Sequence, residues 1–168
     1  MLKKFILLLL LPLLMACPSP NKDAEITTYY FIRHAEKDLS NPDNPNPDLT
    51  AEGLQRAEKW REILGQVRFD EVYSTDLIRT RKTAQPIAEA QGLSVRLYNH
   101  KDLDYKQFLE NTRGKTVLVV GHSNSTPKFV NWFVGYDKYE EIDEKQYGFL
   151  FQVVLLGDKV AASLFEID

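Results

Sequence analysis

The sequence predicts an α/β fold with a central, mostly parallel sheet. From Ile26 onward, stretches rich in β-branched and aromatic residues alternate with stretches whose apolar residues follow helical spacing. The stretches at 26–32 and 116–120 are β-branched, aromatic or aliphatic throughout, which is typical of strands covered on both faces. The chain has 168 residues, 43% of them hydrophobic, which is enough for the core of one domain.

The expected elements follow from local patterns and from turn residues. Strands are expected at 26–32, 69–73, 93–98 and 116–120, with a closing hairpin at 149–156 and 159–165. Helices are expected at 50–64, 76–90, 104–112 and 127–134. Thr50 is the expected N-cap of the first helix, whose inward face would hold Leu54, Ala57, Trp60 and Leu64. Prolines, asparagines and aspartates make 40–49 a loop.

The first residues have the pattern of a secretory signal peptide. Lys3 and Lys4 make residues 1–4 a positively charged region, and the apolar run at 5–15 is shorter than the roughly 20 residues that a membrane span needs. Leu14-Met15-Ala16-Cys17 resembles the lipobox of bacterial lipoproteins, which implies cleavage and lipidation at Cys17. The expected organisation is therefore a signal peptide at 1–16, a lipidated cysteine and tether at 17–25, and a domain at 26–168. An exported protein, anchored by lipid to a membrane of the bacterial cell envelope, is predicted.

Charge argues against a nucleic-acid partner. The chain has 21 Lys and Arg against 24 Asp and Glu, a formal net charge of -3, and its basic residues form no long block. The 138–147 segment is acidic and aromatic, and as a charged run it is expected to face solvent rather than to cover a site.

Three polar clusters follow predicted strands. They are 33–37 (Arg-His-Ala-Glu-Lys), 74–79 (Ser-Thr-Asp-Leu-Ile-Arg) and 121–124 (Gly-His-Ser-Asn). Open α/β sheets bind their ligands at the carboxyl ends of strands, so the clusters are expected to converge. Two arginines and two histidines at one point form a cationic pocket suited to a phosphoryl group, and a neutral imidazole among cations can act as a nucleophile.

The quoted motifs resemble the histidine phosphatase superfamily, which includes the cofactor-dependent phosphoglycerate mutases. Residues 31–37 look like its Arg-His-Gly signature, with Ala35 in place of glycine, and 49–57, 73–84 and 118–124 look like three further motifs in the family order. The resemblance covers nearly all of the chain after the tether. It implies a three-layer fold, with helices on both faces of the sheet.

The resemblance also implies roles for individual residues. His34 would be the nucleophile that becomes phosphohistidine, Arg33 and Arg79 would hold the phosphoryl oxygens, and His122 would donate a hydrogen bond to them. No metal and no cofactor are implied, and the chain has no His-x-His or His-Glu-x-x-His spacing. The expected reaction is hydrolysis of a phosphomonoester or of phosphohistidine, on a phosphorylated small molecule or protein.

The general acid is less well defined by sequence. Asp102 is the first candidate and Asp104 the second, and each is explained equally well as a helix cap or a solvated residue. A poorly activated leaving group would favour labile substrates such as phosphohistidine or aryl phosphates. The stretch between Arg79 and His122 is too short for the cap insertion of the mutases, so an open pocket is expected, with 40–48 as its rim.

Two other functions are compatible with parts of the pattern. Residues 121–125 approach the nucleophile elbow of an esterase with Ser123 as nucleophile, but Ser125 stands where that motif needs glycine and no histidine follows His122. The more serious alternative is a non-catalytic lipoprotein that binds phosphate or a phosphorylated ligand. The intact pair of His34 and His122 favours catalysis.

Overall fold

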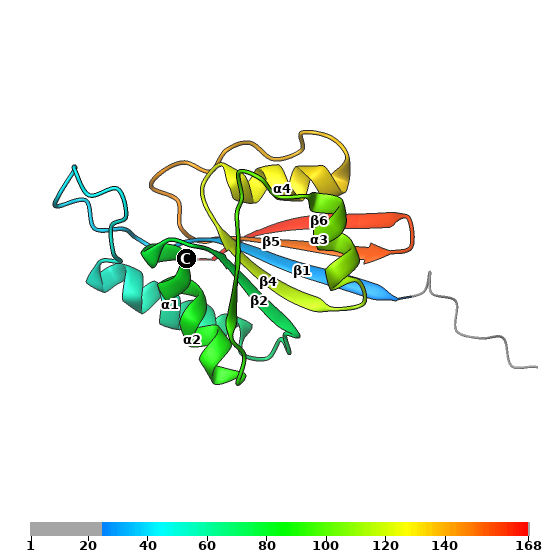
Figure 1. Cartoon of the computed structure of the whole chain (residues 1–168), viewed down its shortest axis with the longest axis horizontal. Coiled ribbons are helices and arrows are strands. Elements are labelled where there is room, and N and C mark those ends of the chain that lie inside the picture. The colour runs from blue at the N-terminus through cyan, green and yellow to red at the C-terminus, as the bar shows by residue number, and fades with distance from the viewer. Residues whose placement is uncertain (1–24, 168) are drawn as a thin grey trace, which may run out of the picture.

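The computed structural model describes residues 25–167, which form a sheet between two pairs of helices (Figure 1). The strands are β1 (Ile26–Arg33), β2 (Glu71–Thr75), β3 (Val95–Tyr98), β4 (Thr116–Gly121), β5 (Phe149–Leu156) and β6 (Lys159–Glu166). The helices are α1 (Ala51–Leu64), α2 (Ile78–Ala90), α3 (Tyr105–Thr112) and α4 (Ser125–Val134). The expected α/β order is confirmed.

The sheet order places β1 and β4 at the centre. The order is β3-β2-β4-β1-β5-β6; the pairs β2–β3, β2–β4 and β1–β4 are parallel, and β5 and β6 add an antiparallel hairpin. Arg33 is opposite Gly121 and Ser74 is opposite Val120. Three parallel strands therefore end side by side, and the residues that follow them meet at one edge of the sheet.

Two hydrophobic cores lie on opposite faces of this sheet. The side chains of β1 and β4 alternate between them: Phe31 and Val119 pack with α3 and α4, whereas Ile32 and Leu118 pack with α1 and α2. Figure 1 shows the same division, with α1 and α2 on one side of the strands and α3 and α4 on the other. The three-layer architecture expected from the resemblance is confirmed.

Local sequence explains where the helices begin. Thr50 accepts a hydrogen bond from Gly53 N at 3.0 Å and caps α1, and Asp104 accepts one from Gln107 N at 3.0 Å and caps α3. Gly53, and not Leu54, is on the buried face of α1, and Leu54 is 48% exposed, so its expected inward position is wrong. The reason is that Gly53 packs against the backbone of Glu36, where only a residue without a side chain fits.

Several predicted boundaries move by two residues. The second strand spans Glu71–Thr75 and not 69–73, because Asp70 is bonded to the backbone of Thr116 before the strand pairing begins. The expected signal peptide, and Cys17 with its tether as far as residue 24, lie outside the described residues. Among residues 25–167, no helix is long and apolar enough to cross a membrane.

Candidate active site

A cavity of about 770 Å³ opens at the carboxyl ends of β1, β2, β3 and β4. Its lining includes three of the four residues for which the sequence predicted a role in phosphate chemistry: His34, Arg79 and His122. Arg33 lies beside it as the last residue of β1. The predicted convergence of the three polar clusters is therefore observed in the structure.

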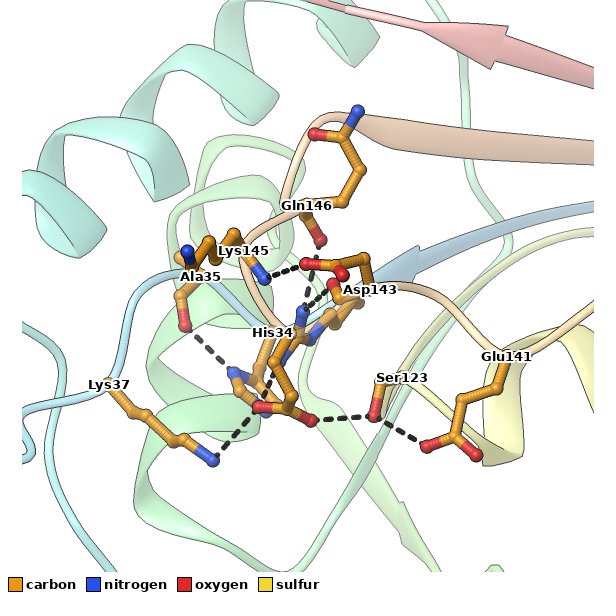
Figure 2. Close-up of polar contacts among 10 residues, drawn as sticks. His34, Ala35, Lys37, Ser123, Glu141, Asp143, Lys145 and Gln146 are labelled. Carbon is orange, nitrogen blue, oxygen red and sulfur yellow. Dashed lines mark hydrogen bonds and ion pairs between the residues drawn. The ribbon is translucent and has the colours of Figure 1, made fainter.

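His34 is fixed in one orientation by backbone contacts. Its backbone N–H donates to Gly121 O at 3.0 Å, and its Nδ1 lies 2.8 Å from Ala35 O (Figure 2). A carbonyl oxygen can only accept, so Nδ1 carries the proton and the lone pair is on Nε2. Burial lowers the pKa of His34 to about 4; the hydrogen bond to Ala35 opposes this shift, and the charges of Arg79, Arg33 and Lys37 reinforce it. The ring is therefore neutral near pH 7 and presents a basic nitrogen.

His122 is held by a chain of hydroxyl groups. Its Nε2 lies 3.0 Å from Thr75 Oγ1, which donates to Thr80 Oγ1 at 2.9 Å, and that hydroxyl donates in turn to the carbonyl of Thr75. Burial, reinforced by the nearby His34, His100, Arg79 and Arg33, lowers the pKa of His122 to about 3. Its ring centroid is 5.5 Å from that of His34, so both imidazoles face one ligand position. Sequence patterns did not reveal the contact with Thr75.

The two arginines hold buried donors at or beside the cavity. Among the described residues, Arg33 Nε and the Nε and Nη1 of Arg79 are buried without a hydrogen-bond partner. Buried guanidinium nitrogens are normally paired, and leaving them unpaired is costly. Phosphate satisfies such donors through parallel N–H···O bonds. The arrangement therefore fits an anion with several oxygens.

The remaining donors of Arg33 contact the segment before β5. Nη1 donates to the carbonyl oxygens of Asp143 at 2.8 Å and Gln146 at 3.1 Å, and Nη2 pairs with Glu144 at 2.9 Å. The guanidinium also stacks over the Tyr147 ring, 4.4 Å from its centroid. Arg33 is 1% exposed as a result.

The expectation that 138–147 merely faces solvent is therefore wrong in part. Its charged side chains are largely exposed, but Ile142 is buried and Glu144 lines the cavity. Glu144 also accepts from Ser123 Oγ at 3.0 Å and from Lys37 at 3.3 Å, and Figure 2 shows Ser123 bonded to Glu141 as well. This charged segment covers the site because two of its carbonyl oxygens and one of its carboxylates accept hydrogen bonds from buried Arg33.

The first candidate for the general acid lies away from the cavity. Asp102 accepts a hydrogen bond from Asn99 at 2.8 Å and is not among the residues that line the cavity, while Asp104 is occupied as the cap of α3. In this structure the turn after β3 directs a different residue, His100, into the site, and the role of Asp102 stays a prediction. His100 lines the cavity, 4.8 Å from the His122 ring between centroids.

The loop at 40–48 contributes to the rim, as expected. Pro45 lines the cavity, and Asn46 Oδ1 accepts from Ile78 N at 3.0 Å, which ties the loop to the first turn of α2. Asp48 pairs with Lys82 at 2.6 Å on the same helix.

Within the described part of the chain, no three His, Cys, Asp or Glu side chains are grouped as metal ligands.

The model of the histidine phosphatase superfamily (branch 1) matches residues 29–104, a region that holds Arg33, His34 and Arg79. Over this region the chain matches the superfamily that its sequence motifs resemble. The match ends before His122, whose place in the site comes from the pairing of β4 with β1. The search of curated proteins found no match.

Solved structures of this superfamily fold resemble the chain over most of its length. YhfR from Bacillus stearothermophilus matches with a TM-score of 0.69 at 14% identity, over 84% of this chain and 98% of that one. The protein histidine phosphatase SixA complexed with tungstate matches with a TM-score of 0.66 at 16% identity, over 83% and 96%. Phosphoserine phosphatase from Entamoeba histolytica matches with 0.62 at 18% identity, over 84% and 98%. At these identities the likeness establishes the fold.

Proposed function

We propose that this protein is a metal-independent phosphatase that forms a covalent phosphohistidine on His34. One observation carries the proposal: a neutral imidazole with its lone pair on Nε2 lies beside buried guanidinium nitrogens of Arg33 and Arg79 that are without partners among the described residues. Nucleophile and anion-binding donors are thus assembled before substrate arrives, which is what phosphoryl transfer requires of a protein.

The reaction has two displacements. His34 Nε2 attacks phosphorus, the bond to the leaving oxygen breaks, and the phosphoryl group is transferred to the ring. Water then attacks phosphorus, the P–N bond breaks, and inorganic phosphate is released. Arg33 and Arg79 stabilise the charge that spreads over the phosphoryl oxygens in both steps. Thr75 Oγ1 holds the Nε2 side of His122, and the ring donates to the phosphoryl oxygens from Nδ1 in the imidazolium form that a bound anion favours.

The substrate class follows from the shape and charge of the cavity. An open cavity of about 770 Å³ accommodates a phosphorylated small molecule or an exposed phosphorylated side chain of a protein. The superfamily neighbours include SixA, named as a protein histidine phosphatase, and a phosphoserine phosphatase. We propose a phosphomonoester or phosphohistidine as substrate, acted on by a domain that the lipid on Cys17 anchors to the bacterial cell envelope.

Hydrolysis in the presence of EDTA tests the mechanism. Residues 18–168, which contain the whole described domain, are assayed with an aryl phosphate and with phosphohistidine. We expect turnover that disappears in His34→Ala and in Arg79→Ala. Arg81→Ala is the matched control on the same helix, because its side chain is 46% exposed and, within residues 25–167, its one ion pair is with Asp76.

A specific alternative is a protein that binds phosphate without turnover, because Glu144 already occupies one nitrogen of Arg33. Vanadate binding separates the two functions. If the unmodified chain binds vanadate through His34 and Arg79 but hydrolyses neither substrate, the binding function is correct. An esterase is disfavoured, since Ser123 Oγ contacts the carboxylates of Glu141 and Glu144.

A further inference from the structure

His100 lies across the cavity from the nucleophile. His34 follows β1 and His100 follows β3, and the sheet order β3-β2-β4-β1 puts two strands between them. Neighbouring strands are about 4.8 Å apart, so the two histidines come from opposite walls of the site. His122 and Arg79, which follow β4 and β2, come from the positions between them. A phosphoryl group held by Arg79 therefore has His34 on one side and His100 on the other.

This placement matches the demands of an in-line displacement. The attacking nitrogen and the leaving oxygen lie roughly in line on opposite sides of phosphorus. With His34 attacking, the leaving oxygen points toward the wall formed by the end of β3 and the turn after it, where Leu97, Asn99, His100 and Lys101 line the cavity. A group that protonates the leaving oxygen has to be on that wall.

The carboxylates that line the cavity and the ammonium group of Lys37 are already engaged. Glu144 is bound by Arg33 and Lys37, and Asp76 pairs with Arg81 at 3.1 Å. Lys37 is itself tied to Glu144, on the β1 side of the site. Among the described residues, no hydrogen bond engages the ring of His100, so both of its nitrogens are available to a ligand.

We propose that His100 is a catalytic residue that protonates the leaving oxygen; this inference rests on the proposed phosphatase function. As His34 Nε2 bonds to phosphorus, the P–O bond breaks, its electron pair stays on the oxygen, and a ring N–H of His100 supplies the proton that makes the free alcohol or phenol. In the second step the neutral His100 takes a proton from the attacking water. Ester and water are thus converted into alcohol and inorganic phosphate, and His100 is restored.

The charges around His100 link its protonation to substrate binding. Burial lowers the pKa of His100 in the free protein, and Lys101 and Arg79 lower it further. A phosphoryl anion on Arg79 acts in the opposite direction, because it neutralises a cation beside the ring and attracts the imidazolium form. A monoester that arrives as its monoanion brings the required proton with it.

The test varies the leaving group. For residues 18–168, kcat/KM is measured on phenyl, nitrophenyl and dinitrophenyl phosphate, whose leaving groups need progressively less protonation. We expect His100→Ala to lose about 100-fold on phenyl phosphate and to come within about threefold of the unmodified chain on dinitrophenyl phosphate. His100→Gln should show the same trend, and Asp102→Asn should show no loss on any of them. Vanadate affinity within about threefold indicates that the phosphate site is intact.

Each other outcome overturns the inference. An equal loss on all three esters assigns His100 a structural or phosphate-binding role. The acid is assigned to Asp102 if the loss in Asp102→Asn, and not in the His100 variants, grows with the leaving group's need for a proton. If the unmodified chain is active and only the His100 trend is absent, the phosphatase function survives. If it hydrolyses none of the esters, and phosphohistidine is not hydrolysed either, both proposals fall together.

Discussion

Arg33 Nη2 lies 2.9 Å from Glu144 Oε2, and this pair joins a guanidinium that is 1% exposed to a carboxylate that is 62% exposed. Burial alone would raise the pKa of Glu144, but the hydrogen bond from Ser123 and the charges of Arg33 and Lys37 lower it overall. An ionised carboxylate thus occupies a donor that an incoming phosphoryl group would use. The segment before β5 thus covers Arg33 and occupies part of its guanidinium.

Removing the carboxylate should strengthen anion binding. Glu144→Gln is expected to bind vanadate about two- to fivefold more tightly, because the competing charge is lost. The carboxylate of the pair is largely exposed, and an ion pair screened by solvent is worth roughly 0.2–1 kcal/mol. Titration with vanadate measures the effect. Glu141→Gln is the control, since Glu141 contacts Ser123 but not Arg33. Weaker binding by Glu144→Gln would mean that this carboxylate organises Arg33 for the ligand.

The hydroxyl of Thr75 should matter for rate through its contact with His122. Thr75→Val keeps the side-chain shape but leaves His122 Nε2 without its partner at 3.0 Å, so the ring can rotate away from the phosphoryl group. We expect kcat to fall by about 10- to 100-fold, the range typical of a displaced catalytic group. Thr75→Ser keeps the hydroxyl and should stay near the unmodified rate; an equal loss in both variants would contradict this role.

Much of the site was predictable because parallel strands end together. His34, Arg79 and His122 each follow a strand with a strong local pattern, so their convergence needed no knowledge of contacts between distant residues. His100 also follows a predicted strand, and this position was the sequence signal that could have placed it in the site. His100 belongs to none of the recognised motifs. Its place opposite His34 depends on the sheet order, which local patterns do not encode.

The cover over Arg33 could not be predicted for a different reason. Glu144 is 111 residues away in sequence, and the charged run around it reads locally as a solvated surface. Its role arises because Arg33 is buried at the end of β1 and needs acceptors, which the segment before β5 supplies. Local patterns also misplaced Leu54. Helical spacing allowed its side chain to face inward, whereas the close packing of Gly53 on Glu36 leaves it exposed.

The packing of Gly53 on Glu36 predicts that a substitution favoured by helix propensity will lower the stability of the fold. In a helix, alanine is favoured over glycine by about 0.5–1 kcal/mol. At Gly53 an added Cβ would lie 2.3 Å from Glu36 O, which is backbone and already accepts from Thr50 N. We expect Gly53→Ala to destabilise the fold by about 1–3 kcal/mol in denaturant unfolding and to lower activity, because Glu36 follows closely after His34. Gln55→Ala, on the exposed face of α1, should change stability little; a stabilised Gly53→Ala would refute the contact.

The buried neutral state of His34 predicts that stability declines in mild acid. Its pKa is about 4 in the folded chain against an ordinary 6.5, so between these values the unfolded chain binds more protons and folding weakens as pH falls. Between about pH 7 and pH 5 the cost for this one ring is about 2 kcal/mol. Urea unfolding of the unmodified chain and of His34→Asn at both pH values measures it. The variant should lose less stability by about that amount, since asparagine does not titrate and His122 contributes to both chains. Equal losses in the two chains would show that His34 is accessible to protons in the folded state, and the neutral nucleophile would then need another explanation.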